Sequence, residues 1–124
     1  MAWQSYQELV VWQKAMDTAT EIYHVVKKLP KEELYALSDQ MRRAAVSIPS
    51  NIAEGHARST NKDFAWFLSV ALGSKSELET QLLLSVKIGL LSESDIDKAL
   101  SLLTETGKLL TTFIHSLRSR SPKN

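Results

Sequence analysis

The chain has 124 residues, a formal net charge of +1 and no cysteine. This length predicts one domain around a single hydrophobic core, and the lack of cysteine excludes disulfides, thiolate metal sites and thiol catalysis. The near-neutral charge neither requires nor excludes a nucleic-acid partner, because binding depends on where the charges lie.

Apolar runs in the sequence are too short for a membrane span. None approaches the roughly 20 residues that cross a bilayer. The N-terminus also lacks the basic-then-apolar pattern of a signal peptide. We therefore expect a cytoplasmic protein with no membrane contact.

The first half of the chain contains two segments with helical apolar spacing. The first covers residues 5–28, with Ser5 and a glutamate three residues later at the spacing of a capping box. Pro30 ends this segment, because the residue before a proline avoids the helical region. The second covers residues 32–57, and acidic residues such as Glu33 suit its N-terminus.

The second half contains two further helical segments. The third covers residues 60–89, with Thr60 as an expected N-cap and Gly89 as an expected C-cap. The fourth covers residues 93–118 and follows Ser92, which again has an acidic residue at capping-box spacing.

Four glycines and three prolines leave little material for turns, which favours a few long helices. Because the connections are short, neighbouring helices must run antiparallel. We therefore predict an all-α, up-down-up-down four-helix bundle formed by residues 1–124, with a short basic tail at 119–124.

Residues 40–58 carry a polar stripe beside the apolar one. The stripe consists of Arg43, Ser47, Ser50, Asn51, Glu54 and Arg58. Pro49 lacks an N–H, so the carbonyl of Ala45 loses its helical donor, and we expect a kink whose freed groups bond to nearby side chains. A serine nucleophile would need a positioned base, and no His, Asp or Lys has a suitable spacing. We predict that the stripe and Pro49 serve helix packing and assembly.

The most distinctive run is Arg-Ala-Ala-Val-Ser-Ile-Pro-Ser-Asn-Ile-Ala-Glu-Gly at residues 43–55. Together with residues 6–16, 67–74 and 76–82, it resembles the bacterial 23S ribosomal RNA intervening-sequence proteins, a family of small four-helix bundles. The resemblance covers about residues 5–115. Lys75 departs from the family pattern, which is usually apolar at that position.

This resemblance implies a homo-oligomer, with the protomers in a pentameric ring. It also implies kinship with the accessory proteins of diversity-generating retroelements, which are barrels of four-helix protomers that bind nucleic acid and a reverse transcriptase. The genomic setting of the intervening-sequence branch implies a link to ribosomal RNA.

Arginines supply candidate contacts to the phosphates of RNA or DNA. The candidates are Arg42, Arg43, Arg58, Arg118 and Arg120. The alternative is structural, because the arginine fork suits pairing with Glu54 or Glu77 within one protomer or between protomers.

Glu21 and His24 reproduce the Glu-x-x-His spacing of ferritin-like di-iron sites. Such a site needs two of these motifs and two further glutamates inside the bundle, whereas this chain has one motif. We therefore expect no metal, no cofactor and no enzymatic activity.

Tryptophans and a second apolar stripe indicate a further surface. We expect Trp3, Trp12 and Trp66 to anchor the core or a subunit interface, with stacking on nucleobases as the alternative. Trp66, Val70 and Gly73 lie off the main apolar stripe of their helix, as an additional interface requires.

These patterns together favour a non-enzymatic oligomer that binds RNA or a nucleoprotein through basic residues. One alternative is a protein scaffold with no nucleic-acid role. A small metal-binding enzyme is the less favoured alternative, because it would need ligands that the spacing does not supply.

Gly73→Glu is expected to lower the mass of the oligomer while the protomer stays folded, because the new carboxylate would be buried against another subunit. Light scattering measures the mass and circular dichroism measures the fold. An unchanged mass would contradict an interface at this position.

Overall fold

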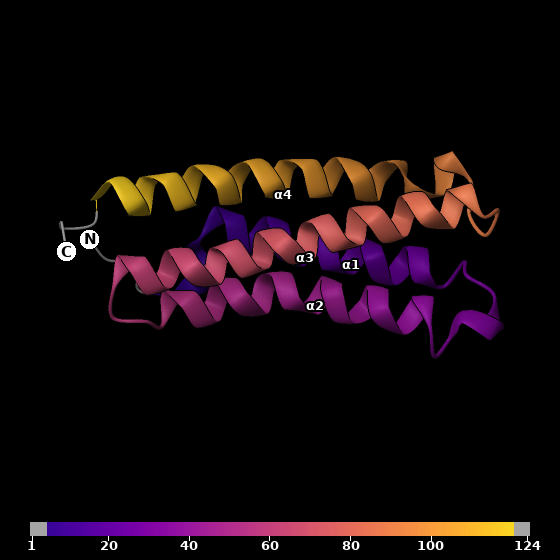
Figure 1. The fold of residues 1–124 in the computed structure, drawn as a ribbon, viewed down its shortest axis with the longest axis horizontal. Coiled ribbons are helices and arrows are strands. Elements are labelled where there is room, and N and C mark those ends of the chain that lie inside the picture. Colours follow the sequence, from indigo (N-terminus) through magenta and orange to yellow (C-terminus); the bar gives the residue numbers. More distant parts are fainter. Residues whose placement is uncertain (1–4, 121–124) are drawn as a thin grey trace.

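The computed structural model describes residues 5–120, which form four long helices and two short 3-10 turns (Figure 1). Consecutive helices run antiparallel, and α1 and α3 each pack against both α2 and α4. The predicted all-α, up-down-up-down four-helix bundle is confirmed. No helix in this described part is long and apolar enough to cross a membrane. The elements are η1 (Tyr6–Glu8), α1 (Val10–Val26), η2 (Lys31–Glu33), α2 (Leu37–His56), α3 (Asn61–Lys87) and α4 (Glu93–Arg120).

The first helix begins later than predicted. Ser5 caps η1 instead, where its hydroxyl accepts a hydrogen bond from the amide of Gln7 at 3.1 Å. Leu9 then adopts an extended backbone, with φ −73° and ψ 127°, and its side chain is buried in the core. Capping-box spacing is local information, whereas the burial of Leu9 is a tertiary constraint, and here the tertiary constraint determines where α1 starts.

The second helix also begins later, at Leu37 rather than near residue 32. Lys31–Glu33 form the separate turn η2, and Ala36 leaves the helical region with φ −123° and ψ −102°. Glu33 still acts at the start of α2, because its carboxylate accepts a hydrogen bond from the amide of Leu37 at 3.4 Å. The acidic residue that predicted the helix start therefore lies outside the helix but caps it.

The predicted caps of α3 and α4 are confirmed. Thr60 accepts a hydrogen bond from the amide three residues later at 3.1 Å. Ser92 and Asp95 exchange two hydrogen bonds, of 2.9 Å and 3.2 Å. The backbone and side chain of Ser92, followed by Lys28 at 3.3 Å, hold the pKa of Asp95 below its usual value. Gly89 follows α3 with a positive φ of 84°, which glycine adopts without strain.

A buried hydroxyl pair joins α1 to α4 within an otherwise largely aliphatic core. The Oγ1 atoms of Thr18 and Thr106 are 2.9 Å apart. Each is also 2.8 Å from a carbonyl oxygen of its own helix, so neither hydroxyl is left unsatisfied. The largest fully buried apolar side chains are Leu9, Ile22, Val25, Met41, Ile48, Ile52, Leu68, Leu78, Leu82, Leu103 and Leu110.

α2 and α3 meet closely at Gly55, just before the turn that joins them. A Cβ atom on Gly55 would lie 2.8 Å from the Cβ of Phe67 and 2.9 Å from Cδ1 of Phe64. Real Cβ atoms do not approach other atoms this closely. The missing side chain of Gly55 therefore sets the spacing of the two helices at this end of the bundle.

Gly55→Ala is expected to destabilise the protein by about 1–3 kcal/mol, because Phe64 or Phe67 must move to admit the methyl group. Gly73→Ala is the matched control, since a Cβ there meets no atom within 4 Å. It should stabilise α3 by about 0.5–1 kcal/mol through the better helix propensity of alanine. Urea unfolding measures the change in the free energy of unfolding for each variant. If both substitutions changed it in the same direction, a tight contact at Gly55 would be contradicted.

Candidate nucleic-acid interface

Within the polar stripe of α2, Ser47 and Asn51 lie in a hydrogen-bonded group that reaches α3. The hydroxyls of Ser47 and Ser74 are 2.8 Å apart, and the side-chain amide of Asn51 donates to the carbonyl and hydroxyl oxygens of Ser47 at 2.8 Å and 2.9 Å. Asn51 therefore bonds to a backbone carbonyl of its own helix, that of Ser47. These contacts hold two helices together, as the packing interpretation of the stripe predicts.

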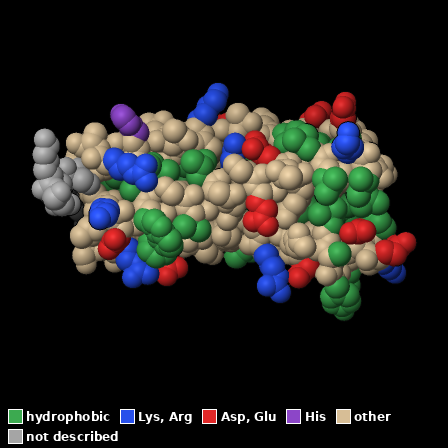
Figure 2. Space-filling view, viewed as in Figure 1, with side chains coloured by type: hydrophobic (Ala, Val, Ile, Leu, Met, Phe, Trp, Pro, Cys, Tyr) green, Lys and Arg blue, Asp and Glu red, His purple; other side chains and the backbone are tan. Residues whose placement is uncertain are grey.

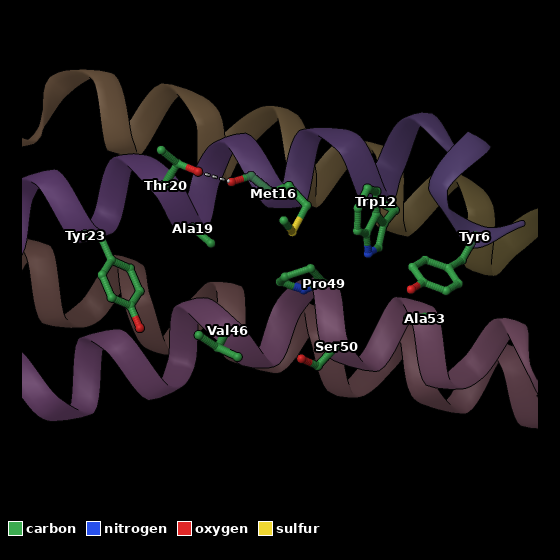
Figure 3. A pocket seen from close by; sticks show the side chains of 10 residues that line it. All are labelled: Tyr6, Trp12, Met16, Ala19, Thr20, Tyr23, Val46, Pro49, Ser50 and Ala53. Atoms are coloured by element: carbon green, nitrogen blue, oxygen red, sulfur yellow. Dashed lines mark hydrogen bonds between the residues drawn. The ribbon is translucent and has the colours of Figure 1, made fainter.

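Pro49 and Ser50 lie on another side of α2, in an open groove between α1 and α2 of about 610 Å³. Figure 3 shows Met16 opposite Pro49, with Tyr6 and Trp12 towards one end of the groove and Tyr23 towards the other. The lining residues are Tyr6, Trp12, Met16, Ala19, Thr20, Tyr23, Val46, Pro49, Ser50 and Ala53. None of these ten is a carboxylate, histidine, lysine or arginine, so the hydroxyls of Tyr6 and Tyr23 are the groups among them that general acid–base catalysis most often uses.

Trp12 is half-buried and packs against the core, with its ring centroid 5.3 Å from that of Tyr6 in an edge-to-face contact. This matches the anchoring role expected for it. Trp3 lies outside the described residues.

Arg42 and Arg43 lie near the start of α2, far from the other candidate arginines. Arg42 is 3.5 Å from the carbonyl oxygen of Leu34, and Arg43 pairs with Asp39 at 3.1 Å. Their separation from Arg58 is about 22–24 Å along the helix axis at 1.5 Å per residue. The five predicted arginines therefore do not form one surface.

Arg58 makes the ion pair that the structural alternative predicts. Its guanidinium lies 3.1 Å from the carboxylate of Glu54 and 4.6 Å from the ring centroid of Phe67. Glu77 does not pair with an arginine in this way, because its carboxylate accepts a hydrogen bond from the side chain of Gln81 at 3.4 Å.

Trp66 lies between two arginines on the outer side of α3. Its residue surface is 59% exposed, and its ring meets that of Phe67 edge-to-face with centroids 5.0 Å apart. Arg58 lies beyond Phe67. On the opposite side of Trp66, Arg118 donates a hydrogen bond of 3.5 Å to the hydroxyl of Ser69, a residue that follows Trp66 by about one helical turn. We define the Trp66 patch as Arg58, Lys62, Trp66, Phe67 and Arg118.

Lys62 and Phe67 are not among the functional residues predicted from the sequence. Lys62 precedes Trp66 by four positions, a spacing that places both residues on one face of a helix. The sequence alone could therefore have paired Lys62 with Trp66. The contact of Phe67 with Arg58 required the turn between α2 and α3.

The two segments that carry the Trp66 patch have a net positive charge, although Glu8 of η1 lies at the same end of the bundle. Residues 54–69 and 115–120 contain four lysines or arginines and two carboxylates, Glu54 and Asp63. Residues 27–43 and 87–98, at the opposite end, contain seven lysines or arginines and six carboxylates. Figure 2 shows Lys and Arg side chains beside hydrophobic ones at the left, where α3 starts and α4 ends.

Arg120 faces a different side of this end, where it lines a groove between α1 and α4. It also belongs to α4, which continues through residues 119 and 120. The predicted start of the tail at 119 is therefore wrong by two residues, and residues 121–124 lie outside the described part of the chain.

Lys75, the departure from the family pattern, is largely covered rather than free in solvent. Its ammonium lies 3.0 Å from the carboxylate of Glu79. Its stem rests on Gly107, where a Cβ would come within 2.8 Å of Cε. The aliphatic part of the side chain thus replaces an apolar residue at this edge of α3, while the charge is paired.

Glu21 and His24 contact each other rather than a second Glu-x-x-His motif. Glu21 lies 3.5 Å from Nδ1 of His24 and 3.6 Å from the ammonium of Lys98. Within residues 5–120, no group of three or more His, Asp or Glu side chains is arranged to hold a metal ion.

Comparisons with known proteins agree with this architecture. A family model described as 23S rRNA-intervening sequence protein matches residues 7–112. Among solved structures, a protein of unknown function from the S23 ribosomal protein family of Bacteroides thetaiotaomicron VPI-5482 is similar, with a TM-score of 0.78 and 28% identity over 85% of this chain and 98% of that chain. None of the curated proteins compared matches the sequence. Because the family model covers most of the bundle, the chain belongs to the 23S rRNA intervening-sequence protein family.

Proposed function

We propose that this protein is a non-enzymatic nucleic-acid-binding protein that uses the Trp66 patch. The observation that carries the proposal is an exposed tryptophan between two arginines, with a lysine one turn away. Basic and aromatic side chains together supply phosphate contacts and a surface for bases. RNA is the expected ligand, because the description of the family refers to 23S rRNA.

The ion pair of Arg58 with Glu54 does not prevent phosphate binding. Both side chains are substantially exposed, and an exposed pair within one helix contributes only about 0.3–0.5 kcal/mol. A phosphate with its full charge can replace the carboxylate at little cost. Arg118 is similarly accessible, since its long contact with the Ser69 hydroxyl is weak.

Arg42 and Arg43 are less suited to this role. They lie near the other end of the bundle, away from the exposed Trp66, among nearly equal numbers of positive and negative side chains. We therefore narrow the arginines expected to bind phosphate to Arg58 and Arg118, with Lys62 as the third cation.

The double substitution Arg58→Ala and Arg118→Ala is expected to weaken RNA binding and to reduce its salt dependence. Loss of two phosphate contacts should lower the slope of log K against log salt by about 1.4 for a single strand. Fluorescence anisotropy with a labelled RNA measures both quantities over a salt series.

Arg43→Ala is the matched control, because this arginine is also exposed and also pairs with a carboxylate four residues away on its helix. It should leave affinity and slope nearly unchanged. Equal effects of the two changes, or no binding by the wild-type protein at low salt, would overturn the proposal.

We also propose that the protein forms a homo-oligomer through the outer face of α3, with the pentameric ring as the stoichiometry that the family resemblance implies. α3 buries Leu68, Leu78 and Leu82 in its own bundle yet also exposes apolar side chains on the outside. A helix that is apolar on two faces suits two contacts. The exposed apolar side chains proposed for this contact are Leu83, Leu84 and Ile88, near the end of the helix.

Leu84→Glu is expected to reduce the mass measured by light scattering without unfolding the protomer, because a carboxylate in an apolar interface is left unpaired. Val46→Glu on α2 is the control, since Val46 and Leu84 are almost equally exposed, at 46% and 45%. An unchanged mass for Leu84→Glu would favour a scaffold that offers this face to a different protein.

A further inference from the structure

We propose that the Trp66 patch binds single-stranded nucleic acid, with an unpaired base stacked on the indole of Trp66. This inference rests on the proposed function and names the class of nucleic acid that the patch selects. It depends on the geometry of the aromatic side chains, whereas nucleic-acid binding in general depends on the cations.

The indole of Trp66 is positioned to accept a planar ligand. The ring planes of Trp66 and Phe67 meet at 87°, so Phe67 packs against the indole edge-to-face and does not stack parallel to it. Phe67 is itself held from the other side by the guanidinium of Arg58, 4.6 Å from its ring centroid. With 59% of its surface exposed, Trp66 offers a supported aromatic surface to solvent.

Cations lie on both sides of this aromatic surface. Arg58 lies beyond Phe67, whereas Lys62 and Arg118 lie along the opposite flank of α3. A strand that crosses the patch would place a base on Trp66 and neighbouring phosphates next to these cations. Stacking accepts any base, so the expected sequence preference is small.

A duplex cannot use the same surface. The faces of paired bases are covered by their neighbours, and exposing one requires it to be flipped out at a cost of a few kcal/mol. Duplex RNA would therefore contact only the cations of the patch. Trp66 should add affinity for unpaired strands alone.

Three labelled probes of the same length, about twelve nucleotides, separate these contributions. They are a single-stranded oligoadenylate, a blunt RNA duplex and a single strand without bases. Trp66→Ala should weaken binding of the oligoadenylate by roughly 5- to 150-fold, the range of one base–aromatic stack. Binding of the duplex and of the baseless strand should change by less than about twofold, because the baseless strand has no base and the duplex exposes base faces only at its two ends.

Trp66→Phe is the conservative control and should retain most of the affinity for oligoadenylate, because phenylalanine also presents an aromatic face. It also supplies a second measurement. Oligoadenylate should quench the tryptophan fluorescence of the wild-type protein, and this quenching should be lost in Trp66→Phe even when the strand is bound.

Two outcomes of the binding assay would overturn the stacking role while leaving the proposed function intact. One is equal weakening of all three probes by Trp66→Ala, and the other is no weakening of any. A lower mass of Trp66→Ala in light scattering would also overturn it, since Trp66 would then belong to the subunit interface that its apolar stripe predicts. If the wild-type protein bound no probe at low salt, the proposed function and this inference would both be wrong.

Discussion

The close contact of α2 with α3 at Gly55 determines which side chains this bundle presents at the end that carries the Trp66 patch. Since Gly55 has no side chain, Phe67 lies directly against α2, and its ring is held between Arg58 and Trp66. Successive residues of a helix are rotated by about 100°, so a Phe67 that faces α2 leaves Trp66 on the outside. A larger residue at position 55 would have to move α3, and the arrangement of the patch would change with it.

Further along the bundle, polar side chains of α2 also contact α3. Ser47, Asn51 and Ser74 form a compact hydrogen-bonded group between the two helices, which resists sliding of one helix past the other. Its dense polar groups resemble an active site in the sequence, but their donors and acceptors are directed at each other. The rotation and the axial position of α3 are therefore both determined by α2.

With its inner face held in this way, α3 has an outer face with two distinct regions. Trp66 lies among cations near the start of the helix, whereas Leu84 and Ile88 lie near its end, and Trp66 and Leu84 are about 27 Å apart at 1.5 Å per residue. The first region is the one proposed to bind nucleic acid, and the second is the one proposed to contact another protomer. An oligomer centred on the second region is compatible with strands bound at the first.

The sequence by itself determined the four-helix architecture and the caps at Thr60 and Ser92, because apolar periodicity and capping depend on residues within about four positions of each other. It did not determine the starts of α1 and α2, where the burial of Leu9 and the backbone of Ala36 override local signals. The contacts of the candidate site likewise include one that local spacing predicts and one that it does not. Pairing of Arg58 with Glu54 follows from helical spacing, but only the tertiary structure brought Arg118 beside α3, 49 positions away from Ser69 in the chain. Local spacing cannot encode such a contact, since it depends on how whole helices pack and rotate.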